Sequence, residues 1–259
     1  MSPKLEAIGK GDEFKQKFLL TDATPAFANA LRKIAMDEVP TLAIEDVDIS
    51  KNSSALYDEM LALRLGLVTF TTDIKGYTPI DKCSCKGESC AKCSVQFTLE
   101  AETVGYVYSS LIKTKDPKVK PVFKDTPIIK LIKGQKVEVQ GNLVMGRGKV
   151  HSKWSPCLIW YNYEPKIKIV DSKVKDAQAI AKICPEVFEV SGNKLKVKDA
   201  YAYKDVCESF EGVEVEFNPN NFIFYVESWG QLTPKEIITT ALDILSEKSE
   251  ELVEALKEK

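Results

Sequence analysis

Residues 24–49 read TPAFANALRKIAMDEVPTLAIEDVDI, and this stretch predicts a helix followed by an acidic strand. Thr24 offers a side-chain oxygen as an N-cap, and Pro25 occupies the first helical position, where its missing N–H costs nothing. The predicted helix ends before Pro40. Its apolar residues recur at helical spacing and share one face: Phe27, Leu31 and Ile34.

A second helix is predicted after the strand. The apolar alternation of residues 41–49 slips by one near Glu45 or Asp46, which is typical of a β-bulge. Three polar residues can cap the second helix: Asn52, Ser53 and Ser54. Its apolar face would consist of Leu56, Met60, Leu63 and Leu67. The two predicted helices carry more apolar surface than residues 24–70 can cover by themselves. We therefore interpret these residues as a docking surface; an ordinary core is the alternative.

The composition is that of a globular protein without a strong charge bias. The chain has 259 residues, of which 44% are hydrophobic, enough for one large or two ordinary domains. Lys and Arg total 36 against 38 Asp and Glu, so the chain lacks the basic excess of a protein whose main partner is nucleic acid. No apolar run approaches the roughly 20 residues that span a bilayer, and residues 1–10 lack the apolar core of a signal peptide. We therefore expect a cytoplasmic protein.

Four of the seven cysteines form a cluster with the pattern C-x-C-x4-C-x2-C: Cys83, Cys85, Cys90 and Cys93. In a reducing compartment this crowding favours a metal over a disulfide framework. Gly87 would let the backbone wrap so that the sulfurs converge, and four thiolates suit a closed, structural zinc site. Two disulfides and an iron–sulfur cluster are the alternatives.

The C-terminal region predicts a hairpin and a long helix. Apolar residues alternate in 213–217 and again in 222–226, with a turn at 218–221 between them. Thr233 and Glu236 form a capping box around Pro234. The helix carries a seam that needs a helical partner, which we expect to come from another polypeptide: Ile238, Leu242, Leu245, Leu252 and Leu256. A terminal helix packed on its own sheet is the alternative.

These signals predict an α+β fold in which one domain is interrupted by another. A sheet with two helices, from residues 1–45 and 213–259, would form a discontinuous dimerisation domain. Residues 46–170 would form a mostly β inserted domain, with strand signals at 95–101, 137–144 and 158–163. Residues 171–212 would form a small third block, with a helix over 177–183 and a hairpin turning at 191–193.

The sequence offers no obvious catalytic centre. We find neither the carboxylate pattern of a two-magnesium site nor a glycine-rich phosphate loop, because the run Gly146 to Lys149 lacks P-loop spacing. His151 is the only histidine and has no local partner for a catalytic dyad, so we expect it to be hydrogen-bonded in a loop or interface.

Four segments together resemble the α-like subunits of cellular RNA polymerases, most closely the family of archaeal D subunits. They are the stretch quoted above, SALYDEMLALRLGL at 54–67, GRGKVHSKWSP at 146–156 and TPKEIITTALDIL at 233–245. They follow the order of the family and span most of the chain. The resemblance implies a dimerisation fold like that of the bacterial α subunit.

The resemblance also implies partners and contact residues. The first and last helices would pack on the smaller α-like subunit L through Phe27, Leu31, Ile34, Ile238, Leu242, Leu245, Leu252 and Leu256. The heterodimer would recruit the polymerase's small N subunit and its large B subunit, with polar contacts from Arg32, Lys33, Arg64 and Arg147. Lys33 and Leu63 depart from the family, which often has arginine and histidine there; lysine cannot make the bidentate contact of an arginine.

The resemblance bears on the remaining cysteines as well. A zinc loop at the position of the four-cysteine cluster occurs in some α-like subunits. Many archaeal members carry a ferredoxin-like insertion in the third block, but here Cys184 and Cys207 are the only remnants of its ligand set. Two thiolates cannot hold a cubane cluster. We therefore predict a relic domain without iron, whose cysteines are free or buried as small apolar residues, as for Cys157.

The sequence thus predicts a non-catalytic assembly subunit of an archaeal DNA-directed RNA polymerase. It would contact DNA only indirectly, bind no small-molecule substrate, and belong to a nucleotidyltransferase as part of a complex. An independent iron–sulfur electron carrier and a free-standing zinc protein that binds nucleic acid are the alternatives.

Overall fold

The structure is a computed structural model that describes residues 2–85 and 90–257, so Gly87 lies outside the described residues. The chain divides into two compact units. The first comprises residues 1–10, 17–30 and 160–225, and the second comprises residues 11–16, 31–159 and 226–259.

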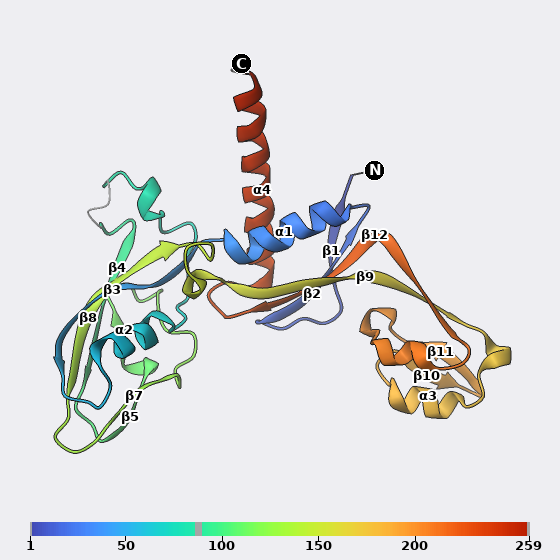
Figure 1. The fold of residues 1–259 in the computed structure, drawn as a ribbon, viewed down its shortest axis with the longest axis horizontal. Helices are drawn as coiled ribbons and strands as arrows, with labels where there is room; N and C mark the ends of the chain where they lie inside the picture. The colour runs from blue at the N-terminus through green and yellow to red at the C-terminus, as the bar shows by residue number, and fades with distance from the viewer. Residues whose placement is uncertain (1, 86–89, 258–259) are drawn as a thin grey trace. The chain divides into compact units, whose positions relative to one another are not determined.

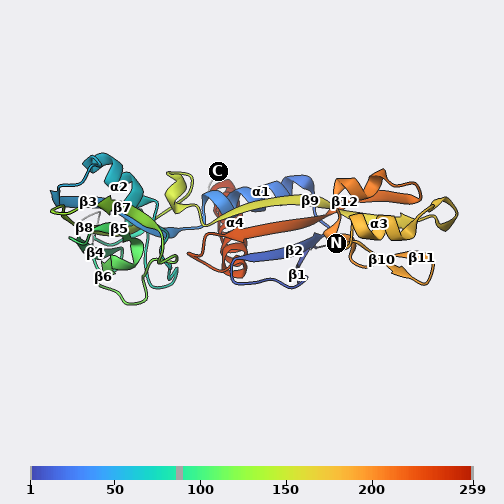
Figure 2. The same ribbon diagram turned by 90° about the horizontal axis from the view of Figure 1, so that it is seen from below.

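A four-stranded sheet carries most of the first unit. Its strands lie side by side in the order β1 (Lys4–Ile8), β2 (Lys15–Thr21), β12 (Val213–Ser228) and β9 (Cys157–Ile169), as Figure 2 shows. Strands β1 and β2 are antiparallel, with Lys4 opposite Thr21. Strand β1 has only partly buried and exposed residues, so apolar alternation could not indicate it from the sequence.

Strand β12 is continuous, so the predicted turn at residues 218–221 is wrong. Polar groups in this stretch bond to neighbouring segments instead of closing a turn. The carbonyl of Asn220 accepts a 2.9 Å hydrogen bond from the Ala23 amide, and the Asn221 amide donates to a Glu164 oxygen at 2.6 Å. These partners are distant in sequence, and a local pattern cannot indicate them.

Helix α1 (Pro25–Asp37) begins as predicted. The Thr24 hydroxyl accepts a 3.2 Å hydrogen bond from the backbone N–H of Phe27, which satisfies one of the free amides of the first turn.

The second unit is built on a four-stranded sheet in the order β3 (Thr41–Asn52), β8 (Val137–Gly146), β4 (Ser94–Ala101) and β6 (Lys113–Thr114). The register between β3 and β8 shifts between Ile44 and Asp46, which confirms the predicted bulge. A two-stranded sheet is formed by β5 (Gly105–Tyr108) and β7 (Pro127–Leu131). An apolar core lies among these strands and includes fully buried Phe70, Phe97 and Leu99.

Helix α2 (Asp58–Gly66) differs from the prediction in its start and its buried face. Tyr57 is the N-cap residue, and the Asn52 side chain instead donates to the Leu56 carbonyl and the Asp58 carboxylate, each at 2.8 Å. The residues that pack inward are Leu61 and Leu65.

The third block has its own small core within the first unit. Helix α3 (Ala177–Ile183) and the hairpin of β10 (Phe188–Ser191) with β11 (Lys194–Val197) confirm the predicted elements. Cys184 and Cys207 are buried there as expected, but they form a disulfide, so the expectation of free thiols is wrong for this pair. Cys184 follows the last residue of α3, Cys207 lies within the 3-10 helix Asp205–Ser209, and both belong to the same core, with a Cα–Cα distance of 6.3 Å.

The chain ends in the long helix α4 (Pro234–Lys257). The predicted capping box is confirmed: the Thr233 amide donates to a Glu236 oxygen at 2.8 Å, and the Glu236 amide donates to the Thr233 hydroxyl at 3.3 Å. Among the described residues, no helix is both long and apolar enough to cross a membrane.

Candidate assembly surfaces and metal centre

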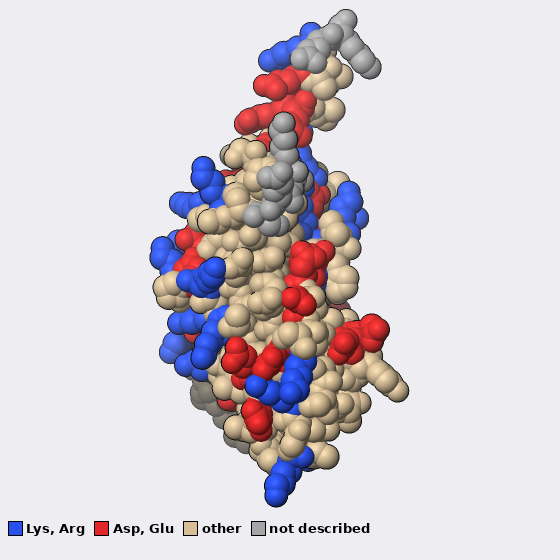
Figure 3. Space-filling model, turned by 90° about the vertical axis from the view of Figure 1, so that its left-hand side faces the viewer, with Lys and Arg blue, Asp and Glu red and all other residues tan. Residues whose placement is uncertain are grey.

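The distal part of α4 exposes an apolar surface. Leu252, Val253 and Leu256 are exposed at 63%, 49% and 67%; we call these three residues the distal α4 face. Figure 1 shows this part of the helix extending beyond the rest of the second unit, and Figure 3 shows uncharged side chains on one side of it and acidic ones on the other. Exposed leucines at successive turns on a helix are the pattern of a surface that packs on another helix.

The structure divides the predicted dimerisation residues into three groups. Leu31, Ile34 and Ile238 are buried within the chain. Partly exposed positions are held by Phe27, Leu242 and Leu245. Leu252 and Leu256 are exposed. Along α4, the predicted interface residues are therefore buried in the chain's own core near the start of the helix and exposed near its end.

The segment 146–156 packs against the end of α1. The Lys149 amide donates a 2.8 Å hydrogen bond to the Asp37 carbonyl, and the Ser155 hydroxyl donates to the Met36 carbonyl at 3.0 Å. A Cβ at Gly148 would lie 2.4 Å from the Met36 carbonyl oxygen, so only glycine allows this approach. The glycine-containing run 146–149, which lacks P-loop spacing, thus packs the segment 146–156 against the end of α1.

Trp154 fixes the same segment to the second unit's sheet. Its side chain is buried, and its indole N–H donates to the Val144 carbonyl at 3.2 Å. The Lys153 ammonium lies 4.4 Å from the indole ring centre and is ion-paired with Glu45. His151, the single histidine, accepts a 3.1 Å hydrogen bond from the Lys153 amide through Nδ1, which is the loop role expected for it.

Three of the predicted polar contact residues lie near this docked segment. Arg32 and Lys33 lie on α1, whose end binds the segment, and Arg147 lies within the segment. Lys33 is exposed, whereas Arg32 and Arg147 are partly buried. Arg64 lies on α2, and its guanidinium donates to the carbonyls of Ile128 and Pro127 at 2.5 and 2.6 Å. Two of the N–H groups of Arg64 are therefore used within the chain and are not available to a partner subunit.

The outer side of α2 is a second exposed apolar surface. Met60, Leu63 and Leu67, which were predicted to share one face, are exposed at 47%, 50% and 53%. Tyr57 lies one turn earlier and is 81% exposed. We call these four residues the outer α2 face. Tyr57 was missed by the sequence reasoning, although its spacing of three from Met60 was a usable signal.

The four clustered cysteines converge on one point. Their sulfur atoms all lie within 4.8 Å of one another. The shortest separations are 3.6 Å between Cys85 and Cys93, 3.7 Å between Cys83 and Cys90, and 3.8 Å between Cys90 and Cys93. These distances exceed the roughly 2.05 Å of a disulfide bond, and the described cysteines of the cluster are free.

The backbone around the cysteine cluster holds the sulfurs in place. The amides of Cys93 and Ser94 both donate to the Cys90 carbonyl at 2.9 Å, which forms a tight turn just before β4. Burial raises the pKa of the Cys93 thiol because the uncharged form is favoured away from water. A bound divalent cation reverses that preference, since it stabilises thiolates. The arrangement can therefore bind a metal ion but holds no reactive thiolate by itself.

The fold and the two apolar helix faces define an α-like subunit of the kind that works by assembling with other chains. The sequence profile of the RNA polymerase Rpb3/Rpb11 dimerisation domain matches residues 17–249, and the chain belongs to this family. The DNA-directed RNA polymerase subunit Rpo3 of Methanosphaera stadtmanae is 34% identical, covering 97% of this chain and 98% of that protein. The proteins of the same name from Methanosarcina acetivorans and Pyrococcus furiosus are each 37% identical over 93% of this chain, covering 93% and 92% of their own lengths.

Proposed function

We propose that this protein is an assembly subunit of an archaeal DNA-directed RNA polymerase and that it forms a heterodimer with the smaller α-like subunit L. The distal α4 face carries this proposal. Three large apolar side chains are exposed on the otherwise mostly charged distal part of α4. Their exposure to water is unfavourable by about 25 cal/mol per Å² of apolar surface, and a partner helix would remove that cost. The family match and the archaeal relatives support a polymerase subunit as the partner.

The buried residues of the predicted interface take a supporting role in this proposal. Leu31, Ile34 and Ile238 would hold the helices in position, whereas Phe27, Leu242 and Leu245 are accessible enough to contact the partner at the edge of the chain's core. The ion pair of Lys248 with Glu38 ties α4 to the end of α1 within the second unit. The proposed dimerisation domain of residues 1–45 and 213–259 would contribute both helices.

The N and B subunits of the polymerase would bind the remaining surfaces. The docked segment 146–156 with Lys33 and Arg147 offers cationic and backbone groups, and the outer α2 face offers apolar ones. Both surfaces belong to the proposed inserted domain or its border with α1. A platform of this kind needs no catalytic groups of its own, would meet DNA only through the assembled enzyme, and would act in the cytoplasm.

We propose zinc as the metal of the four-cysteine cluster. With Zn–S bonds of about 2.3 Å, a tetrahedral site has sulfur–sulfur edges of about 3.8 Å, close to the separations of 3.6 to 3.8 Å found here. A multi-iron cluster would set its ligand sulfurs farther apart, because inorganic atoms lie between them. Zinc would be held by all four thiolates and would order the loop without any open position for catalysis.

Co-expression with subunit L tests the proposed heterodimer. The full chain and subunit L should co-elute in size-exclusion chromatography with the mass of a one-to-one complex by light scattering. Replacing Leu252 and Leu256 together by aspartate should abolish the complex, because two charges would be buried at the interface. These side chains are exposed in the isolated chain, so the variant should fold normally.

The double variant Glu250→Gln with Glu254→Gln is the matched control, since it changes the acidic side of the same helix. It should leave the complex intact. Retention of the complex by the aspartate variant, or equal loss in both variants, would show that the distal α4 face is not the interface.

A further inference from the structure

A groove in the first unit is lined by aromatic rings from three segments. It has a volume of about 430 Å³, within the usual range of binding pockets. The rings come from β9, from the 3-10 helix η5 (Ala200–Ala202) with the residue after it, and from β12. Those of η5 and β12 belong to Tyr201, Tyr203, Phe217 and Tyr225, whereas the β9 rings of Tyr161 and Tyr163, which also border the groove, pack on Phe222 and Phe224.

The rings are accessible and held in place. Phe217 is exposed at 46%, and Tyr203 and Tyr225 are partly exposed, which is a large apolar surface to leave in water. The Phe217 ring packs edge-on against Tyr203 at 5.7 Å between centres, and Tyr225 is stacked on Trp160 at 5.3 Å. A set of fixed, flat aromatic faces is therefore offered before any ligand binds.

Hydrogen-bond donors and negative charge accompany the rings. The Tyr203 hydroxyl donates to Glu208 at 3.0 Å, and burial together with this carboxylate raises the pKa of Tyr203 to about 12, so it remains protonated at neutral pH. The Tyr201 hydroxyl donates to Glu164 at 3.2 Å. Asp205 lines the groove and is its only charged lining residue among the described residues. The charge that lines the groove is therefore negative.

A lysine close to the rings already has partners. The Lys17 ammonium lies 5.2 Å from the Tyr225 ring centre and donates to the Tyr201 carbonyl at 3.2 Å. Its charge therefore lies beside Tyr225 and is shared with a backbone carbonyl.

We propose that this aromatic groove binds an extended proline-rich segment of another protein, with an arginine or lysine of that segment facing Asp205. Polyproline II segments dock in grooves lined by aromatic side chains, because their rings stack flat and their shape is preformed. Such a segment has no internal hydrogen bonds, so its carbonyls need donors, which the Tyr225 hydroxyl and the Asn162 side-chain amide can supply. The carboxylate of Asp205 complements the basic residue.

Single-stranded nucleic acid is the competing occupant, since bases also stack on aromatic rings. Such sites combine the rings with a positively charged groove that follows the phosphates. The charged lining residue here is an aspartate, with Glu164 and Glu208 behind the tyrosine hydroxyls. The local charge therefore favours the peptide.

The test is a selection of random twelve-residue peptides, displayed on phage, on the full-length chain. Enriched peptides should contain two prolines separated by two residues and a flanking arginine or lysine. The best peptide, labelled with fluorescein, is then titrated by anisotropy. Tyr203→Ala and Phe217→Ala should each weaken binding by about tenfold or more, as expected for central aromatic contacts. Asp205→Asn should weaken it by about threefold and reduce its dependence on salt.

Two controls separate loss of the groove from loss of the fold. Phe217→Tyr keeps the ring and should bind within about twofold of the unchanged protein. Tyr106→Ala removes an exposed tyrosine outside the groove and should have no effect. The proposal is overturned if no peptide is enriched, if the enriched peptides lack proline, or if Tyr203→Ala and Phe217→Ala both bind normally. Binding of a labelled twelve-nucleotide oligothymidylate that is lost in Phe217→Ala, without peptide binding, would instead assign the groove to nucleic acid.

Discussion

The hydroxyl of Thr41 donates a 2.8 Å hydrogen bond to the backbone carbonyl of Trp154, and Thr41 is fully buried. The bond joins the first residue of β3 to the segment 146–156, which in turn packs on the end of α1. The stretches 24–49 and 146–156, which both carry the family resemblance, are thus linked by one hydrogen bond between residues 113 positions apart.

Replacing Thr41 by valine should lower the free energy of unfolding by about 1–3 kcal/mol, because the buried Trp154 carbonyl loses a partner that water cannot replace. The shape of the side chain is kept, so packing changes little. Urea unfolding followed by tryptophan fluorescence measures the loss. Thr41→Ser keeps the hydroxyl and should lose less than Thr41→Val; equal losses would mean that the methyl group matters more than the bond.

Gly148→Ala should lower the free energy of unfolding by about 1–3 kcal/mol, as for other substitutions that force atoms into a packed site. The added carbon would lie 2.4 Å from the Met36 carbonyl oxygen, and backbone cannot move aside as a flexible side chain can. Gly66→Ala is the matched control, since its added carbon would meet its nearest neighbour at an ordinary 3.7 Å. Thermal unfolding of the two variants compares them directly, and a similar melting temperature for both would contradict the proposed tight contact.

Local patterns predicted α1 and α4 well because their signals are local: a cap, a proline at the first position and apolar residues at helical spacing. The same reasoning located α2 but not its orientation. Its sequence offers two apolar stripes, Leu61 with Leu65 and Met60 with Leu63 and Leu67, and only the packing against the second unit's sheet decides which is buried. Tertiary contacts also kept β12 straight where asparagines indicated a turn.

The candidate site was predictable to a similar degree. Cysteine spacing alone located the four converging sulfurs, because a metal site built from one loop is a local feature. The disulfide of Cys184 and Cys207 was not predicted, since it depends on two segments meeting in a small core. Apolar spacing found the distal part of α4, but exposure along that helix could be read only from the structure.

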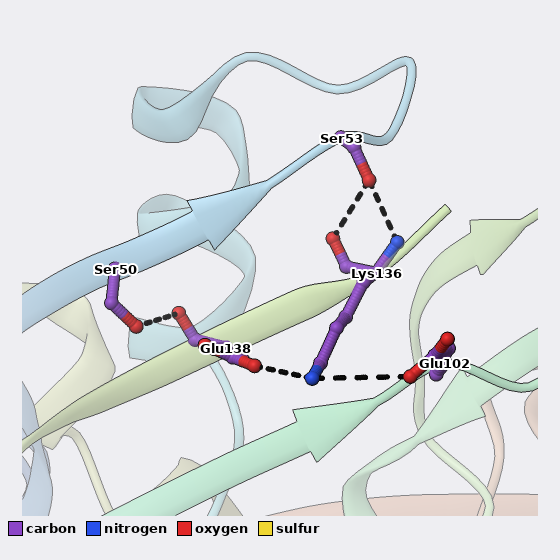
Figure 4. A network of polar contacts seen from close by, with 5 residues as sticks. All are labelled: Ser50, Ser53, Glu102, Lys136 and Glu138. Carbon is purple, nitrogen blue, oxygen red and sulfur yellow. Dashed lines mark hydrogen bonds and ion pairs between the residues drawn. The ribbon is translucent and has the colours of Figure 1, made fainter. Parts of the chain in front are cut away.

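The ion pair of Lys136 and Glu138 should contribute to stability in a pH-dependent way. Figure 4 shows the Lys136 ammonium between Glu138, at 2.5 Å, and Glu102, at 3.8 Å. The hydrogen bond from Lys136 lowers the pKa of the Glu138 carboxyl below its ordinary 4.5. A carboxyl with a lowered pKa in the folded state stabilises the protein above its unfolded pKa, and this contribution is lost as the pH falls through the folded pKa.

Glu138→Gln should therefore be less stable than the unchanged protein at pH 6, with the difference shrinking as the pH falls below about 4.5. Urea unfolding at several pH values measures it. Glu102→Gln should show a smaller difference, because its oxygen is more distant from the ammonium. A difference for Glu138→Gln that stays constant from pH 6 to pH 3 would rule out the ion pair as its source.

Cys93→Ser should abolish metal binding while leaving the second unit folded. Cys93 is buried among the four sulfurs and contacts two of them, so its loss removes the central ligand of a tetrahedral site. The apolar core of the second unit lies outside the cysteine loop, which confines the damage to that loop. Metal analysis should give one zinc per unchanged chain and none for Cys93→Ser, and limited proteolysis should cut the variant faster near residues 83–93.

Cys157→Ser is the matched control, since this buried thiol lies outside the cluster and donates to the Ala35 carbonyl; this variant should keep its zinc. Iron in place of zinc, or full zinc in Cys93→Ser, would show that the cluster does not bind the metal proposed for it.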